Sequence, residues 1–207
     1  MDFLLSSAVP DRNAMRKYAF WLGLGVFIAL LAVAGLALAQ PYRLRGSIID
    51  PPQPAPPIDL NGFDLSAQRG KVVLIFFGYT TCPDVCPATL GEMKQVLQRL
   101  GAQAERVQVV FVTVDPQRDT AEKMRTYTAA FDPRITGVTG TEEDLQPIWQ
   151  AYGVYREIRQ GGTAAGYLVD HSARVYLIDT EGMLRATYSF GTPVEDILSD
   201  VRFLLKP

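Results

Sequence analysis

Short apolar runs alternate with amphipathic stretches along much of the chain. Residues 71–77 and 107–114 are almost wholly apolar and rich in Val, Ile and Phe, which predicts two buried strands. Residues 88–100 carry apolar side chains at helical spacing. A second helix is predicted over 119–131, with Asp119 as an acidic N-terminal cap. This order of strand, helix, strand and helix indicates parallel strands joined by helices.

The second half of the chain predicts a further helix, a strand hairpin and a closing helix. Pro147 is expected to kink or shorten the helix predicted over 141–152. The remaining elements are expected as strands at 166–170, 174–179 and 184–190, and a helix at 193–205. The fold class is therefore α/β, with a mixed sheet that has a parallel half, an antiparallel half and helices on both faces.

One long apolar segment precedes these elements. Residues 18–39 contain no charged side chain, and as a helix they would span roughly 30 Å of hydrocarbon. We expect a transmembrane anchor here, with residues 1–17 as a short cytoplasmic N-terminus whose start is Met1 or Met15. The alternative is a cleaved signal peptide, because Ala37-Leu38-Ala39 resembles a cleavage site. Both interpretations export the rest of the chain.

The composition changes again after the apolar segment. Residues 40–57 are predicted to form an extended linker, because five prolines cluster there: Pro51, Pro52, Pro54, Pro56 and Pro57. The exported domain is then expected to comprise residues 58–207.

Composition and charge restrict the chemistry. The chain has 207 residues, of which 48% are hydrophobic, and a net charge of −2. Without a basic surplus, a nucleic-acid partner is not expected. The chain has only two cysteines, Cys82 and Cys86, and one histidine, His171. This excludes a disulfide-dense scaffold and any site built from several histidines of one chain.

The two cysteines lie in Cys82-Pro-Asp-Val-Cys86-Pro87, between the first predicted strand and the first predicted helix. In such sheets, residues that bind ligands usually lie at the carboxyl ends of the strands. Each proline disfavours helical backbone before it, so both cysteines are expected to lie off the regular helix. A helix N-terminus near Cys86 would favour a thiolate. The pair is interpreted as a structural disulfide, a redox-active dithiol or a metal-binding dithiol.

His171 is predicted to lie in a loop between two strands, and the simplest interpretation is an ordinary surface histidine. If the loop returns to the edge where the Cys82 loop emerges, two thiolates and one imidazole form a soft ligand set suited to copper. Structural zinc sites need four protein ligands, and the chain offers no further cysteine or histidine. Asp170 is the candidate for orienting the imidazole, or is a plain loop acid.

Three segments carry a specific resemblance, and they are quoted in chain order: Phe76-Phe-Gly-Tyr-Thr-Thr-Cys-Pro-Asp-Val-Cys-Pro87, Val112-Thr-Val-Asp-Pro-Gln-Arg-Asp-Thr120, and Tyr167-Leu-Val-Asp-His-Ser172 with Tyr176-Leu-Ile-Asp179. From residue 58 onward the chain resembles the SCO1/SenC family. The resemblance implies a thioredoxin-like fold and copper, as Cu(I) and also Cu(II), bound by Cys82, Cys86 and His171. It also implies that Cys82 and Cys86 form a disulfide when oxidised.

The same resemblance implies a cellular role and a location. It implies assembly of the CuA centre of cytochrome c oxidase subunit II, with a separate protein as the copper donor. It places the domain in the bacterial periplasm, held by one helix in the inner membrane, or at the mitochondrial inner membrane in a eukaryote. Thioredoxins carry two residues between their cysteines, whereas three stand between Cys82 and Cys86 here, which favours metal binding.

Other functions remain as alternatives. A thiol–disulfide oxidoreductase acting on the CuA-site cysteines needs Cys82 and Cys86 but not His171. A thiol peroxidase has little support, since no peroxidase motif surrounds either cysteine. A purely structural or adaptor role is a further alternative. Asp115 and Asp119 are interpreted as a strand end and a helix cap. Three aromatic residues are expected in the core or the wall of the site: Phe76, Phe77 and Tyr79.

Overall fold

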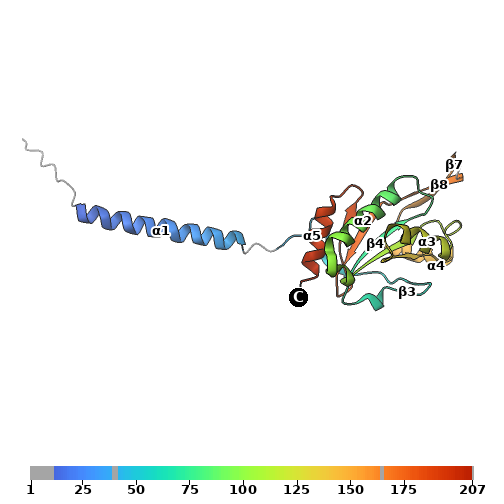
Figure 1. Cartoon of the computed structure of the whole chain (residues 1–207), viewed down its shortest axis with the longest axis horizontal. Helices are drawn as coiled ribbons and strands as arrows, with labels where there is room; N and C mark the ends of the chain where they lie inside the picture. The colour runs from blue at the N-terminus through green and yellow to red at the C-terminus, as the bar shows by residue number, and fades with distance from the viewer. Residues whose placement is uncertain (1–11, 39–41, 164–165, 207) are drawn as a thin grey trace, which may run out of the picture. The chain divides into compact units, whose positions relative to one another are not determined.

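The computed structural model describes residues 12–38, 42–163 and 166–206, which fall into two units, residues 1–43 and 44–207. Within the first unit, helix α1 (Arg12–Leu38) has 27 residues and is blue in Figure 1. Its described large apolar side chains are exposed, and residues 15–33 are apolar and long enough to cross a membrane. The helix is thus a candidate span that contains most of the predicted anchor.

The second unit is built on a six-stranded mixed sheet in the order β1-β10-β9-β4-β5-β6. β4, β5 and β6 run parallel to one another. β9 pairs antiparallel with β4, β10 pairs antiparallel with β9, and β1 pairs antiparallel with β10. The strand bounds are β1 (Ser47–Pro54), β4 (Val72–Gly78), β5 (Val107–Thr113), β6 (Ile135–Val138), β9 (Arg174–Ile178) and β10 (Met183–Ser189). The predicted mixed sheet with one parallel and one antiparallel half is confirmed.

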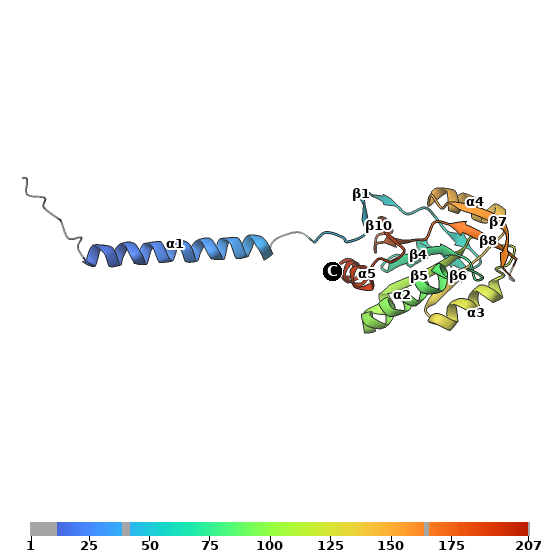
Figure 2. The same ribbon diagram turned by 90° about the horizontal axis from the view of Figure 1, so that it is seen from above.

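Four helices cover this sheet: α2 (Val85–Leu100), α3 (Ala121–Phe131), α4 (Glu142–Ala151) and α5 (Val194–Leu204). Figure 2 shows α2, α3 and α5 on one side of the sheet and α4 on the other. Pro147 lies inside α4 without ending it. The helices predicted from periodicity are therefore present, and both faces of the sheet are covered.

Smaller elements complete the fold. Two further sheets have two strands each, formed by β2 (Asp59–Leu60) with β3 (Phe63–Asp64) and by β7 (Arg156–Thr163) with β8 (Gly166–His171). Short 3-10 helices are η1 (Ser66–Gln68) and η2 (Gly101–Arg106). β6 and β7 were not expected from the sequence, because β6 is only four residues long and β7 is largely polar.

The core lies on both faces of β4, in which every residue is buried. Successive side chains point to opposite faces of a strand, so Phe76 and Phe77 enter different halves of the core. Phe76 stacks on Phe111 of β5, with ring centroids 5.8 Å apart. Phe77 packs against Tyr152 and Tyr176 on the other face. This two-sided burial explains why β4 has a continuous apolar sequence.

The prediction of a linker over residues 40–57 is wrong for its central part. Residues 47–54 form β1, which pairs antiparallel with β10 at the edge of the sheet. The pairing shifts register between Ile48 and Gln53, so Pro51 and Pro52 fall in the irregular stretch. Proline is tolerated at such bulges and at sheet edges because its missing N–H is not needed there. Extended backbone was expected, but its pairing partner lies far away in the sequence.

A buried carboxylate fixes the start of this strand. Asp200 of α5 is completely buried and accepts hydrogen bonds from the backbone N–H of Arg45 at 2.8 Å and of Gly46 at 3.3 Å. It also accepts one from the hydroxyl of Tyr188 at 2.8 Å. A buried charge is stable only with such partners. The folded domain therefore begins near Leu44 rather than at residue 58.

Candidate metal centre

The two cysteines lie where β4 gives way to α2. Cys82 is in the connecting loop and partly exposed, whereas Cys86 is completely buried in the first turn of α2. The prediction that Cys86 lies off the regular helix is therefore wrong. Pro87 is accommodated at the third helical position, because the first turn of a helix has no internal partner for its N–H groups.

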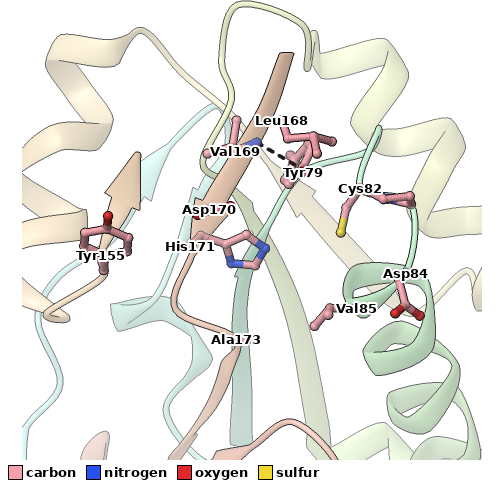
Figure 3. A pocket seen from close by; sticks show the side chains of 11 residues that line it. Tyr79, Cys82, Asp84, Val85, Tyr155, Leu168, Val169, Asp170, His171 and Ala173 are labelled. Carbon is pink, nitrogen blue, oxygen red and sulfur yellow. Dashed lines mark hydrogen bonds between the residues drawn. The ribbon is translucent and has the colours of Figure 1, made fainter. Parts of the chain in front are cut away.

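His171 approaches the cysteines from a different part of the fold. It is the last residue of β8, in a separate two-stranded sheet, and not in a loop after a strand of the main sheet as predicted. Its Nε2 lies 3.4 Å from the Sγ of Cys86. The ring stands edge-on to Tyr79 at 5.8 Å and faces the side of the pocket that holds Cys82 (Figure 3). The ligand atoms of Cys82, Cys86 and His171 all lie within 4.8 Å of one another.

The two thiols are electrostatically unequal. The Cys86 thiol, the imidazole of His171 and the backbone N–H groups of Asp84 and Cys86 hydrogen-bond to Cys82, and together they lower the pKa of Cys82 to about 3. Hydrogen bonding to Cys82 and burial raise the pKa of Cys86. The thiolate expected near the helix N-terminus is thus carried by Cys82 rather than Cys86, since donors converge on the more exposed sulfur.

Asp170 does not orient the imidazole. Its carboxylate pairs with the Nε of Arg159 on β7 at 2.5 Å, while the Nδ1 of His171 lies 3.2 Å from the carbonyl oxygen of Ser172. Of the two roles considered for Asp170, that of orienting the imidazole is therefore wrong, and the carbonyl oxygen of Ser172 lies beside Nδ1 instead.

A second aspartate, Asp119, connects the cysteine loop to the end of β5. Asp119 is completely buried and accepts hydrogen bonds from the backbone N–H of Thr80 at 3.1 Å, the hydroxyl of Thr80 at 2.5 Å and the hydroxyl of Thr113 at 2.7 Å. The cap of α3 is Thr120, so the prediction that Asp119 caps this helix is wrong. Asp119 instead ties the end of β5 to the loop that leads to Cys82.

The site opens into a cavity of about 460 Å³. The wall residues come from the cysteine loop, the start of α2, the residue before β7, and β8 with the residues after it: Tyr79, Cys82, Pro83, Asp84, Val85, Tyr155, Leu168, Val169, Asp170, His171 and Ala173. Tyr79 is buried and accepts a hydrogen bond from the backbone N–H of Val169 at 3.3 Å (Figure 3). The expected wall role of Tyr79 fits this geometry. An external group can reach Cys82 and His171 through the open side.

Gly78, the last residue of β4, allows the buried sulfur to approach the sheet. A Cβ at this position would lie 2.8 Å from the Sγ of Cys86 and 2.7 Å from the ring of Phe111. We expect Gly78→Ala to destabilise the protein by about 1–3 kcal/mol, because overpacking strains a dense core. Urea denaturation measures this loss. Gly91→Ala is the control, since a Cβ there meets nothing within 4 Å, and an equal effect of both changes would contradict the explanation.

Comparison with known proteins covers nearly the whole second unit. The family model described as SCO1/SenC matches residues 60–206. The chain belongs to the SCO1/SenC family. Among curated SCO1/SenC relatives, the bovine (Bos taurus) protein "Protein SCO2 homolog, mitochondrial" is 39% identical over 136 residues, which is 65% of this chain and 51% of the relative. The chain thus spans about half the length of the mammalian relatives it matches.

Solved SCO1/SenC structures share the fold. The apo Sco1 protein of Thermus thermophilus is 37% identical and superposes with a TM-score of 0.69, covering 79% of this chain and 98% of that protein. ScoI of Bradyrhizobium japonicum, whose structure has copper bound, is 35% identical with a TM-score of 0.65, covering 74% and 99% respectively. The predicted family and the thioredoxin-like mixed sheet are confirmed.

Proposed function

We propose that this chain binds copper through Cys82, Cys86 and His171 and supplies it during assembly of the CuA centre of cytochrome c oxidase subunit II. The observation that carries the proposal is the convergence of two sulfurs and one imidazole nitrogen within 4.8 Å, from segments 85 residues apart in the chain. Support also comes from membership of the SCO1/SenC family and from a relative whose structure has copper bound.

The residues present fit copper as a cargo. Metal–sulfur and metal–imidazole bonds of roughly 2.0–2.3 Å place two donors on one ion about 4 Å apart, close to the separations seen here. Thiolate sulfur selects Cu(I), and imidazole suits Cu(I) and Cu(II). A closed zinc site needs a fourth protein ligand, and the chain has no further cysteine or histidine.

The unequal exposure of the ligands suits a site that releases its metal. Cys82 and His171 border the open cavity, whereas Cys86 is completely buried. A recipient's thiols can therefore exchange first with the two accessible ligands, while Cys86 retains the ion until transfer is complete. A copper donor would load the site by the same route in reverse.

We further propose that α1 holds the domain at a membrane. Residues 18–39 would form the anchor and residues 1–17 the short cytoplasmic segment. The copper-binding domain would then face the bacterial periplasm, or the corresponding side of the mitochondrial inner membrane. The length and apolar character of α1 support membrane attachment. The name of the bovine relative, which calls that protein mitochondrial, fits the second of these locations. Leu44 replaces residue 58 as the start of the folded domain in this layout.

A second function is favoured by the low pKa of Cys82 next to a second free cysteine. As a thiol–disulfide oxidoreductase, the Cys82 thiolate would attack a partner disulfide and release one partner thiolate. Cys86, after losing its proton, would then attack the Sγ of Cys82 and release the second partner thiolate. The products are a reduced partner and a Cys82–Cys86 disulfide, which would prepare CuA-site cysteines for copper.

The His171→Ala variant separates the two functions. We expect its Cu(I) affinity to fall at least roughly tenfold, because one of three ligands is lost, while reduction of a partner disulfide persists. The measurement is anaerobic Cu(I) titration against a competing chelator, followed by a disulfide-reduction assay on metal-free protein. Glu105→Gln, which changes an exposed acid of η2 outside the cavity wall, should leave the affinity unchanged. Native affinity in His171→Ala would refute the proposed ligand set.

A further inference from the structure

The main sheet does not hold the strand that carries His171. Within the residues that the structure describes, β8 forms its strand ladder only with β7. The position of His171 against Cys86 must therefore depend on contacts other than the ladders of the main sheet. Tyr167, Val169 and His171 alternate along β8, so their side chains share the face that meets the cysteine loop and the end of β5.

Tyr167 makes the first of these contacts. Its hydroxyl donates a hydrogen bond of 2.7 Å to the Oδ1 of Asp115, a completely buried carboxylate just after β5. Arg118 contributes from the same segment. Its guanidinium lies over the Tyr167 ring, 3.7 Å from the centroid, and its Nη1 donates to the Tyr167 carbonyl oxygen at 2.8 Å. Stacking and hydrogen bonding thus act on one residue of β8.

Arg118 is itself fixed from two sides. Its Nε donates to the Oδ2 of Asp115, which closes a triangle of Asp115, Arg118 and Tyr167. The guanidinium also lies 5.6 Å from the ring centroid of Tyr79, the residue that stands edge-on to His171. A planar guanidinium that stacks and donates in a fixed geometry is suited to this role, and lysine is not an equivalent replacement.

We propose that Arg118 and Tyr167 form a clamp that positions His171 as a copper ligand. The predicted effect of the clamp on copper affinity rests on the proposed copper-binding function. The contacts that form the clamp are between protein side chains and do not depend on copper. The clamp fixes β8 four residues before His171, and the hydrogen bond from Val169 to Tyr79 fixes it two residues before. Arg118 and Tyr167 are positioning residues, since neither offers a ligand atom to the site.

A double-mutant cycle in the full-length chain in detergent tests the clamp. The variants are Tyr167→Phe, which removes only the hydroxyl, Tyr167→Leu, which also removes the ring, and Arg118→Lys. Each is made in the native and the His171→Ala background, and Cu(I) affinity is measured against a competing chelator. Tyr176→Phe is the matched control, because its hydroxyl donates to the carbonyl oxygen of Tyr152 in the core, outside the cavity wall.

We expect Tyr167→Leu and Arg118→Lys to lower Cu(I) affinity about five- to tenfold, with a smaller loss for Tyr167→Phe. In the His171→Ala background each change should have less than about a twofold effect, because the imidazole no longer contributes. In metal-free protein, hydrogen exchange of the amides of residues 167–171 should accelerate in the clamp variants and stay unchanged in Tyr176→Phe. This last readout does not depend on copper.

The outcomes separate the two proposals. Equal losses of affinity in both backgrounds, or native affinity and native exchange in Tyr167→Leu and Arg118→Lys, would overturn the clamp and leave the ligand set intact. If the single variant His171→Ala keeps native Cu(I) affinity, His171 is not a copper ligand. The proposed ligand set is then wrong, and so is the role of the clamp in positioning a copper ligand. Tyr167→Phe keeps the test decisive where a larger change prevents folding.

Discussion

Replacing Cys86 with serine is expected to reduce Cu(I) affinity by at least about two orders of magnitude, because a hydroxyl oxygen is a poor ligand for a soft ion. The change is nearly isosteric, so the completely buried position retains its packing. The remaining pair, Cys82 and His171, lies at the open side of the cavity and offers only one thiolate. Anaerobic Cu(I) titration against a chelator of known affinity measures the loss.

Met93→Leu provides the matched control for this prediction. Met93 is also completely buried on α2, two turns beyond Cys86, and the change removes a sulfur without touching the site. Its Cu(I) affinity should equal that of the native protein. Equimolar binding at native affinity in Cys86→Ser would show that the buried sulfur is not a ligand.

Replacing Asp119 with alanine is expected to lower the free energy of unfolding by about 3 kcal/mol or more. The change leaves the backbone N–H of Thr80 and the hydroxyls of Thr80 and Thr113 without their acceptor in a buried region. Urea denaturation of a fragment covering residues 44–207, which contains the whole main sheet and its core, measures the loss.

Asp144, an exposed acid in the capping box of α4, is the control for this loss of stability. Asp144 accepts a hydrogen bond from Thr141 at the start of α4, so Asp144→Ala should cost only about 1 kcal/mol. Copper affinity should fall in Asp119→Ala, since Thr80 stands two residues before Cys82, and should be unchanged in Asp144→Ala. Similar stability losses in the two variants would contradict the central role given to Asp119.

Elements with strong local patterns could be predicted from the sequence. β4, β5 and the helices α2 and α5 have apolar patterns that their burial in the fold reproduces. The three site residues could be selected because the chain has so few soft ligands. Their convergence within 4.8 Å follows from the family resemblance, and from topology only on the condition that the His171 segment returns to the Cys82 edge, since no local pattern encodes a distance between β8 and α2.

The residues around the site show where local patterns end. Asp119 stands before a helix and looks like its cap, and it does pair with Lys123 of that helix at 3.5 Å. Its side chain nevertheless accepts its hydrogen bonds from Thr113 and from Thr80, which lies 39 positions away. Arg118 and Tyr167 are 49 positions apart, and the residues around them do not predict that the two side chains stack. Such long-range polar contacts follow from the assembled fold. Polar side chains lack the periodicity that would expose their partners beforehand.

The prolines of β1 have a consequence for how copies of this domain avoid one another. An edge strand with free N–H groups is a template on which a strand of another molecule can add, and this is a common start of aggregation. Pro51, Pro52 and Pro54 have no backbone N–H, so β1 offers fewer donors to an added strand than other residues would. Copies of the domain are therefore less prone to join along this edge of the sheet, even at high local concentration.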